Sequence, residues 1–154
     1  MTHICYYESP IGVLRIFENG NGITMIKFVT DPKEKPNTLE ANTPLLKEAV
    51  QQLAEYFAGK RNEFLLPLDL RGTDFQLRTW NALRDIPYGE TRTYKQIAEA
   101  VGCPKGCRAI GLANNRNPVS IVVPCHRVIG ANGNLTGYAG GLDIKEQLLA
   151  LEKK

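Results

Sequence analysis

Short apolar runs alternate with turn residues along the first part of the chain. Three of these runs are rich in β-branched and aromatic residues and are separated by Ser-Pro and Asn-Gly pairs: Ile4–Tyr7, Val13–Glu18 and Ile23–Val29. Segments of this composition between turn residues are typical of β-strands. They predict an antiparallel meander. The polar stretch Asp31–Asn42, with two prolines and no apolar period, predicts a loop.

A helix and an edge strand are expected next. Thr43 is suited to cap a helix that has Pro44 at its first position and Gly59 beyond its end. Apolar positions recur at helical spacing at Leu46, Val50, Leu53 and Phe57. Such a helix would cover one face of the small sheet. Phe64–Leu70 is expected to add an edge strand, where Pro67 is tolerated.

From residue 72 onward the pattern changes to short helices. Two Thr-x-x-Gln sequences have the form of capping boxes that open helices: Thr73–Gln76 and Thr93–Gln96. A third helix is expected to begin at Pro104 and to run through Leu112. The second and third helices, joined by a tight turn with a glycine, form a candidate helix-turn-helix, whose second helix normally meets DNA. The pattern alone equally allows a helix pair with no contact to DNA.

The last part of the chain has a buried segment and a final helix. Ile121–Val123 is continuously apolar and predicts a buried strand that leads to Cys125. An Asn132-Gly133 turn follows, and a last amphipathic helix uses Leu142, Leu148, Leu149 and Leu151. The fold class expected is α+β, with an N-terminal scaffold domain over residues 1–71 and a helical domain over residues 72–154.

Charge is distributed unevenly along the chain. The chain has a net charge of +3. Residues 1–70 contain 7 Lys and Arg and 9 Asp and Glu, a net charge of −2, whereas residues 71–154 contain 12 and 7, a net charge of +5. A basic surface attracts phosphate backbones without reading their sequence. The second half is therefore a candidate for binding nucleic acid, although a basic surface that is merely solvated explains the charge as well.

Cysteine usage and hydropathy indicate the compartment. The four cysteines among 154 residues are too irregularly spaced for a disulfide framework, and no secretion signal opens the sequence. No apolar run approaches the roughly 20 residues that a membrane-spanning helix needs. We expect a cytoplasmic protein, associated with the nucleoid if the source is prokaryotic, that does not interact with membranes.

Cys125 is the candidate nucleophile because His126 follows it directly. A thiol reacts as the thiolate, and burial opposes ionisation, so a reactive buried cysteine needs a base or a positive neighbour. Neighbours in a strand face opposite ways, so the pair works only if the chain turns there, which Pro124 favours, or if a water molecule carries the proton. Glu152 is one candidate among several to orient the histidine. The alternative is an inert cysteine packed in the core.

The run Asn117–Val128 closely resembles the active-site signature of the O6-alkylguanine-DNA alkyltransferases, also called methylated-DNA–protein-cysteine methyltransferases. Further matches occur in the order and at the spacing of that family: Thr73-x-Phe75-Gln76, Ile86-Pro87-Tyr88-Gly89, Thr93-Tyr94, Arg108 and Tyr138-Ala139-Gly140-Gly141-Leu142. The resemblance covers essentially all of residues 72–152. It implies a ribonuclease-H-like N-terminal sheet followed by a winged-helix-like DNA-binding domain.

The resemblance also implies the reaction, which is direct reversal of DNA damage. Cys125 would displace guanine from the alkyl carbon and keep the alkyl group as a thioether, so each molecule would act once and without a cofactor. His126 would serve as base through a water molecule, with Glu152 orienting it. Tyr94 would donate a hydrogen bond to the departing guanine. O4-alkylthymine is a second possible substrate.

By the same resemblance the partner is double-stranded DNA, bound through the minor groove. We expect the protein to be a monomer. Arg108 would fill the place that the flipped nucleotide leaves in the base stack. Ala109, Gly111 and Ala113 would let the helix approach the groove closely, although tight packing between helices explains these small residues equally well.

The remaining matches concern the pocket for the flipped base. Tyr138, Ala139 and Gly140 would form its wall, and the backbone carbonyls of Cys125 and Val128 would accept hydrogen bonds from the base. Asn117 and Pro124 would hold the active-site turn. Ala139 stands where some family members have serine, which is expected to alter substrate preference or inhibitor sensitivity. Lys145 matches a family lysine near the pocket, but a solvated helix lysine is an equally good explanation.

Three other functions compete with alkyl transfer. Zinc binding through Cys103 and Cys107 lacks a matching second pair of ligands, so no metal is expected. Lesion recognition without transfer, as in alkyltransferase-like proteins, requires a different residue in place of Cys125. A cysteine hydrolase would turn over repeatedly, and no site for an acyl substrate is apparent in the sequence.

Overall fold

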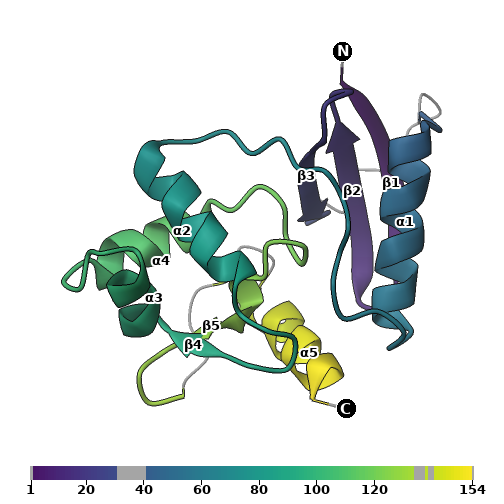
Figure 1. The fold of residues 1–154 in the computed structure, drawn as a ribbon. Coiled ribbons are helices and arrows are strands. Elements are labelled where there is room, and N and C mark those ends of the chain that lie inside the picture. The colour runs from purple at the N-terminus through teal and green to yellow at the C-terminus, as the bar shows by residue number, and fades with distance from the viewer. Residues whose placement is uncertain (1, 31–40, 134–137, 139–140, 154) are drawn as a thin grey trace. The chain divides into compact units, whose positions relative to one another are not determined.

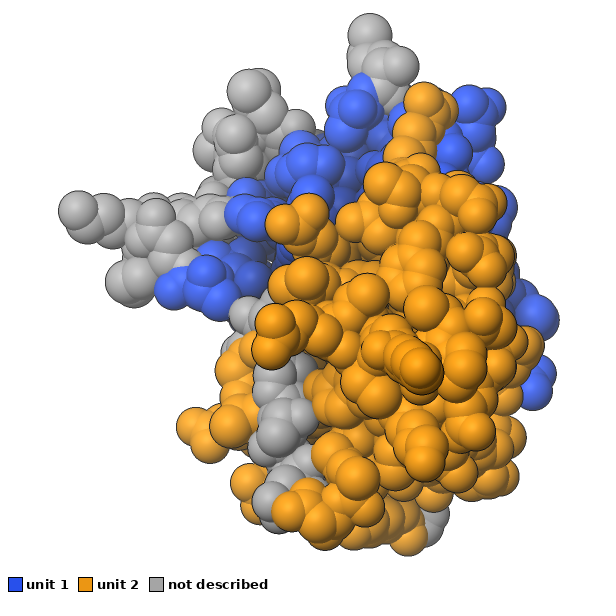
Figure 2. Space-filling model, turned by 90° about the vertical axis from the view of Figure 1, so that its left-hand side faces the viewer, with its two compact units in different colours: residues 1–70 blue, residues 71–154 orange. Residues whose placement is uncertain are grey.

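The computed structural model describes residues 2–30, 41–133, 138 and 141–153 (Figure 1). The chain forms two compact units, residues 1–70 and 71–154, which Figure 2 colours separately. Each unit has its own secondary structure and its own buried side chains. The fold is α+β, as the sequence predicts.

The first unit contains the predicted antiparallel meander. Its strands are β1 (His3–Ser9), β2 (Gly12–Glu18) and β3 (Ile23–Phe28), and they pair in the order β1-β2-β3. Along β2, burial alternates with a period of two at Leu14, Ile16 and Glu18, as expected for a sheet with one covered face. The prediction of three antiparallel strands is therefore confirmed.

Helix α1 (Pro44–Phe57) covers one face of this sheet, lying over β1 and β2 (Figure 1). It begins as predicted, with the Thr43 hydroxyl accepting a hydrogen bond from the backbone N–H of Leu46. The buried side of the helix is formed by Leu46, Ala49, Gln52, Leu53 and Tyr56. Val50 and Phe57, which we expected on that side, are half-buried. Phe57 instead packs at the margin against the ring of Tyr7.

The predicted edge strand at 64–70 is not a strand. Only one bridge forms, between Leu68 and Ile23 of β3, with the Ile23 N–H donating to the Pro67 carbonyl and the Asp69 N–H donating to the Ile23 carbonyl. Proline lacks an N–H and so cannot continue a ladder. Gly22 permits the close approach, because a Cβ there would lie 2.8 Å from the backbone carbon of Leu68. Of the loop predicted at 31–42, residues 31–40 lie outside the described residues.

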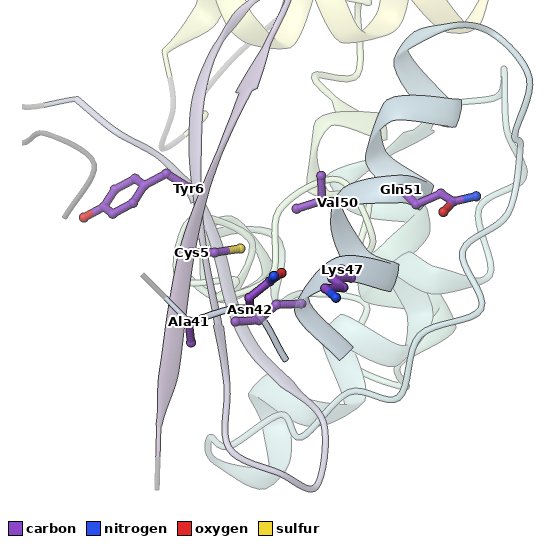
Figure 3. Close-up of a pocket in the computed structure, with 8 residues that line it drawn as sticks. Cys5, Tyr6, Ala41, Asn42, Lys47, Val50 and Gln51 are labelled. Carbon is purple, nitrogen blue, oxygen red and sulfur yellow. The ribbon is translucent and has the colours of Figure 1, made fainter. Parts of the chain in front are cut away.

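A hollow of about 540 Å³ lies in this unit between β1 and α1 (Figure 3). Its lining residues are Cys5, Tyr6, Ala41, Asn42, Leu46, Lys47, Val50 and Gln51. None of them is a residue to which the sequence assigns chemistry.

The second unit opens with the two predicted capping boxes. In α2 (Asp74–Arg84) and α3 (Tyr94–Ala100), the threonine hydroxyl before each helix accepts from a backbone N–H, and the glutamine side chain accepts from the N–H of that threonine. Both predicted helix starts are confirmed. The motif is local, which explains why sequence alone located it.

Helix α4 (Cys107–Asn115) packs against both α2 and α3. It begins at Cys107 rather than at Pro104, because Cys103–Gly106 forms a turn closed by the Gly106 N–H and the Cys103 carbonyl. The indole N–H of Trp80 on α2 donates to the Ala113 carbonyl at 2.9 Å. This buried hydrogen bond fixes which side of α4 faces inward.

The buried strand predicted before Cys125 is absent. Residues 119–124 form turns, and Cys125–Arg127 is a short 3₁₀-helix, η1. The next residues, Val128–Ile129, form β5, which pairs in parallel with β4 (Arg92–Thr93). A run of apolar residues predicts burial, which is correct for Ile121 and Val123, but it does not distinguish an extended strand from a buried turn.

The chain ends with α5 (Leu142–Glu152), which packs against η1. We expected its leucines to form the buried side, but Leu142 is 48% exposed, and the buried residues are Lys145, Leu148 and Glu152. Two charged side chains thus enter the interior beside Cys125–Arg127. No helix of the described residues is long and apolar enough to cross a membrane.

Candidate active site

The turn before Cys125 is held by Asn117. Its side-chain N–H donates to the Val123 carbonyl at 2.8 Å, while its side-chain oxygen accepts from the Val119 N–H at 3.0 Å. Asn117 is itself buried, so these bonds are shielded from water. One amide side chain therefore satisfies two buried backbone groups and fixes the path of the chain into η1.

Ile121, within this turn, has a backbone φ of 73°. A β-branched residue rarely adopts this conformation, which costs about 1–3 kcal/mol. The surrounding bonds impose it: the Val122 N–H donates to the Ser120 carbonyl, and the Val123 N–H donates to the Val119 carbonyl. Strain of this size in the turn that leads to Cys125 indicates that the conformation of the turn is kept at a cost in stability.

Cys125 is the first residue of η1 and is 4% exposed. Its backbone N–H donates to the Val123 carbonyl at 2.8 Å, and its carbonyl accepts from the buried Asn114 side chain at 3.3 Å. Successive residues of a 3₁₀-helix are about 120° apart around its axis. The chain therefore does turn at the Cys-His pair, which was one of the two conditions that the sequence set for joint chemistry.

His126 is completely buried and contacts Glu152 at the end of α5. Its Nε2 lies 2.7 Å from Oε2 of the carboxylate. Burial lowers the pKa of His126 below its ordinary value, although the hydrogen bond and charge of Glu152 oppose this effect. His126 is therefore held as the neutral imidazole near neutral pH.

Arg127 fixes the same carboxylate from the other side. Its Nε donates to Oε1 of Glu152 at 2.8 Å and its Nη2 donates to Oε2 at 3.0 Å, a two-point contact. Its Nη1 donates to the Ile86 carbonyl at 2.7 Å, and its guanidinium lies 5.7 Å from the centre of the Tyr88 ring. Three nitrogen atoms, Nε2 of His126 and Nε and Nη2 of Arg127, therefore determine where the carboxylate of Glu152 lies.

The ionisation of Glu152 determines which nitrogen of His126 carries the proton. Burial alone would raise the pKa of Glu152, but the hydrogen bonds from His126 and Arg127 and the positive charge of Arg127 outweigh it and lower that pKa to about 2. A carboxylate only accepts hydrogen bonds, so Nε2 of His126 must be the donor. Nδ1 then carries a lone pair, and this buried atom has no hydrogen-bond partner among the described residues. It is the site at which His126 can accept a proton.

Lys145 is also fully buried, so the solvated alternative for this residue is wrong. Its Nζ donates to the Val128 carbonyl at 2.5 Å and lies 6.0 Å from the centre of the Tyr94 ring. Burial lowers the pKa of Lys145 to about 8, and the interaction with Cys125 acts in the opposite direction. A positive charge is thus held close to the thiol.

Tyr138 is 9% exposed and is the member of the predicted pocket wall that the structure describes. Burial raises the pKa of its phenol well above the ordinary value, and the electrostatic effect of Cys125 adds to this. The phenol therefore remains protonated close to the sulfur. Ala139 and Gly140 lie outside the described residues.

The predicted DNA contacts lie on α4. Arg108 and Ala109 are exposed, whereas Gly111 is half-buried. A Cβ at Gly111 would lie 4.0 Å from the ring of Tyr94, an ordinary contact distance. Gly111 thus faces Tyr94 at the start of α3, and Arg108 and Ala109 face solvent.

Sequence reasoning named several of the residues that converge here, but not all of them. Cys125, His126, Glu152 and Val128 lie together, and Tyr94 joins them through Lys145. Arg127 and Asn114 were missed. The signal for Arg127 was present, since an arginine next to the Cys-His pair requires an acidic partner if it is buried. Nothing local marks Asn114, whose role depends on the tertiary contact with the Cys125 carbonyl.

Metal binding gains no support from these contacts. The described residues contain no group of three or more His, Cys, Asp or Glu side chains placed to hold an ion. Cys107 is exposed and Cys103 is partly exposed, both as free thiols.

The fold and the site together define a class: a protein with a helix-turn-helix and a buried thiol beside a base that a carboxylate orients. Comparison with known families agrees. Residues 74–154 match the DNA-binding domain of 6-O-methylguanine DNA methyltransferase, and residues 3–70 match its ribonuclease-like domain. The chain belongs to the 6-O-methylguanine DNA methyltransferase family, whose activity is DNA repair by transfer of an alkyl group to a cysteine of the protein itself.

Individual relatives give the same result along nearly the whole chain. A methylated-DNA–protein-cysteine methyltransferase of Methanosarcina acetivorans is 54% identical, with 95% of each chain covered. The Mycobacterium tuberculosis O6-methylguanine methyltransferase structure is 51% identical with a TM-score of 0.88, covering 99% of this chain and 93% of that one. A structure of the M. tuberculosis protein in complex with DNA has the same TM-score at 50% identity, covering 98% and 92%.

Proposed function

We propose that this protein repairs double-stranded DNA by transferring the alkyl group of O6-alkylguanine to the sulfur of Cys125, once per molecule. The observation that carries the proposal is the buried His126–Glu152 pair, 2.7 Å apart, directly after Cys125. Arg127 keeps the carboxylate ionised and in place. The pair thus presents a neutral base with a free Nδ1 next to the thiol.

The first step is loss of the thiol proton. The Cys125 proton passes through a water molecule to Nδ1 of His126, and the resulting imidazolium is stabilised by the Glu152 carboxylate. The ammonium of Lys145 stabilises the thiolate from another side. Burial alone would oppose ionisation of Cys125, so this arrangement of charges explains how a 4% exposed sulfur can react.

The transfer is an in-line displacement at the alkyl carbon. The sulfur of Cys125 forms the new carbon–sulfur bond as the bond from that carbon to O6 of guanine breaks, and the electron pair leaves with guanine. The guanine regains a proton, which His126 returns through water. The product on the protein is a thioether, and no group in the site can cleave it. The reaction is therefore stoichiometric and uses no cofactor.

Tyr94 assists departure of the guanine. Its phenol would donate a hydrogen bond to the ring as negative charge develops there, which lowers the barrier by ~2–4 kcal/mol in comparable cases. Its place supports this role, because the Tyr94 ring lies near Lys145 and faces Gly111 of α4.

The thiol is buried, so the nucleotide must leave the duplex to reach it, at a cost of a few kcal/mol. We propose that Arg108 fills the vacated place in the stack while Ala109 and Gly111 let α4 enter the minor groove. The flipped base would donate to the carbonyls of Cys125 and Val128. The Cys125 carbonyl already accepts from the Asn114 side chain and the Val128 N–H, so the base would have to share or displace one of these bonds. The Val128 carbonyl accepts from Lys145.

The rest of the pocket and of the chain have supporting roles in this proposal. Tyr138 would line the pocket, a role that the family resemblance also assigns to Ala139 and Gly140. Asn117 and Pro124 would hold the turn. Residues 1–71 act as a scaffold domain, and residues 72–154 carry binding and transfer. We place the protein in the cytoplasm as a monomer. O4-alkylthymine is a candidate second substrate.

A titration tests the proposed function. A fixed amount of protein is mixed with increasing amounts of duplex that contains O6-methylguanine, and the repaired guanine is counted. We expect repair to stop at one lesion per protein molecule, with the methyl group on Cys125. Repair in excess of the protein would indicate a hydrolase, and lesion binding without any repair would indicate an alkyltransferase-like protein.

A further inference from the structure

Leu112 is an exposed apolar residue on the helix that carries Arg108. It is 58% exposed, and the other large apolar side chains exposed among the described residues, Leu65 and Leu142, lie elsewhere in the chain. The reaction at Cys125 does not use Leu112. Exposed leucines scattered singly need no special explanation, so the case for Leu112 depends on what surrounds it.

The position of Leu112 on α4 is fixed by the buried side of that helix. Ile110, Ala113 and Asn114 face inward, and the Ala113 carbonyl is bonded to the indole N–H of Trp80. Residues four apart lie one above the other on a helix. Leu112 therefore shares its side of α4 with Arg108, one turn before it.

A second arginine completes this row. Arg116 follows Leu112 by four residues, forms the C-cap of α4 and is exposed. The apolar side chain thus lies between two cations, Arg108, which the proposed function puts into the vacated stack, and Arg116, which can approach a phosphate. A surface that is positive at both ends and apolar at its centre is complementary to a DNA groove whose two rims carry phosphates and whose floor carries base edges and sugars.

We propose that Leu112 is an apolar wedge that enters the minor groove beside the flipped nucleotide and packs against the neighbouring base step. The inference rests on the proposed function, in which Arg108 occupies the vacated stack. Opening a base step exposes apolar base surface, and proteins that bend DNA through the minor groove cover such surface with leucine and similar side chains. Leu112 would therefore stabilise the open duplex, whereas Arg108 replaces the missing base.

The wedge predicts a distinctive salt dependence. A leucine displaces no counterions from DNA, so Leu112→Ala should weaken duplex binding about tenfold without altering the slope of log affinity against log salt. Arg116→Ala should reduce that slope by about 0.9, the value for one phosphate contact. Alanine is the best helix former, so Leu112→Ala should leave α4 intact. Leu65→Ala, at a 76% exposed position in the other unit, is the matched control and should change neither quantity.

The experiment has a binding arm and a transfer arm. Binding of O6-methylguanine duplex is measured in a Cys125→Ser background, which does not consume the lesion. Transfer rates are measured with native Cys125 on duplex, on single strand and on free O6-benzylguanine. We expect Leu112→Ala to slow transfer from duplex about tenfold and from the free base hardly at all, with Leu112→Met close to the native protein.

Unchanged duplex binding, an altered salt slope, or equal losses on duplex and free base would each overturn the wedge. The proposed function is judged separately by the native protein in the same assay. If the native protein takes no methyl group onto Cys125, the proposed function fails. If it does and Leu112→Ala behaves like Leu65→Ala, only the wedge fails.

Discussion

His126 and Glu152 are 26 positions apart in the chain, yet Nε2 of His126 lies 2.7 Å from Oε2 of Glu152 with both side chains fully buried. A helix end and a 3₁₀-turn must meet for this contact to form. The contact fixes the proton on Nε2 and leaves Nδ1 as the acceptor. In the proposed mechanism, the reactivity of Cys125 therefore depends on a carboxylate at the end of α5.

Replacing the Glu152 carboxylate by an amide should slow alkyl transfer by the same factor on both kinds of substrate. We expect Glu152→Gln to reduce the single-turnover transfer rate about 10- to 100-fold, on duplex and on free O6-benzylguanine alike, because the imidazolium loses its stabilising charge. Glu146→Gln, at an exposed position on the same helix, is the matched control. Equal rates for native protein and Glu152→Gln would remove Glu152 from the mechanism.

Glu152 should also contribute to acid sensitivity. A carboxyl group whose pKa is depressed on folding adds stability that is complete above its unfolded pKa and is lost as pH falls through its folded pKa. For Glu152 that interval runs from 4.5 down to about 2. The free energy of unfolding of the native protein and of Glu152→Gln is measured with urea at each pH. The advantage of the native protein should shrink by on the order of 3 kcal/mol as the pH falls through this interval. A difference that is independent of pH would contradict the ionised, hydrogen-bonded carboxylate.

Arg108 should matter only where a base must be flipped. We expect Arg108→Ala to slow transfer from duplex about 10- to 100-fold, because flipping costs a few kcal/mol that the arginine offsets. Transfer from free O6-benzylguanine should stay within about twofold, since that base is not stacked. Lys60→Ala removes one exposed positive charge from the other unit and serves as control. Equal losses on both substrates would place Arg108 outside the flipping step.

Tyr94 should affect the transfer rate from duplex and from free O6-benzylguanine alike, in contrast to Arg108. Tyr94→Phe removes one hydroxyl and keeps the ring beside Lys145, so we expect transfer to slow at least about tenfold on duplex and on the free base. Single-turnover rates measure the effect, with Tyr6→Phe as a control in the first unit. An unchanged rate would show that guanine departs without help from this phenol.

The sequence located local features well. The capping boxes at Thr73 and Thr93 involve groups three residues apart, so no tertiary information was needed to place the starts of α2 and α3. The strands of the meander follow from residue type and turn residues. The start of α4 was placed at Pro104 because proline is favoured in a first helical turn, and the turn that ends at Gly106 gives no comparable signal.

The candidate site was accessible only in part, for a physical reason. Burial of an ionisable side chain depends on partners from distant segments, so helical spacing suggested a leucine face on α5, whereas Lys145 and Glu152 enter the interior. The Ile121–Val123 run has the composition of a strand, and the turn that replaces it depends on the side-chain bonds of Asn117. The resemblance supplied Glu152 as a partner of His126, whereas the residues alone left it one candidate among several.

The most direct test of the account is the mass of the peptide that contains Cys125 after the protein has reacted with O6-methylguanine duplex. The account predicts that this peptide gains one methylene unit, that no other cysteine peptide changes, and that Cys125→Ser binds the duplex but gains nothing. Methyl uptake by the Cys125→Ser protein, or repaired DNA alongside an unmodified Cys125 peptide, would contradict it.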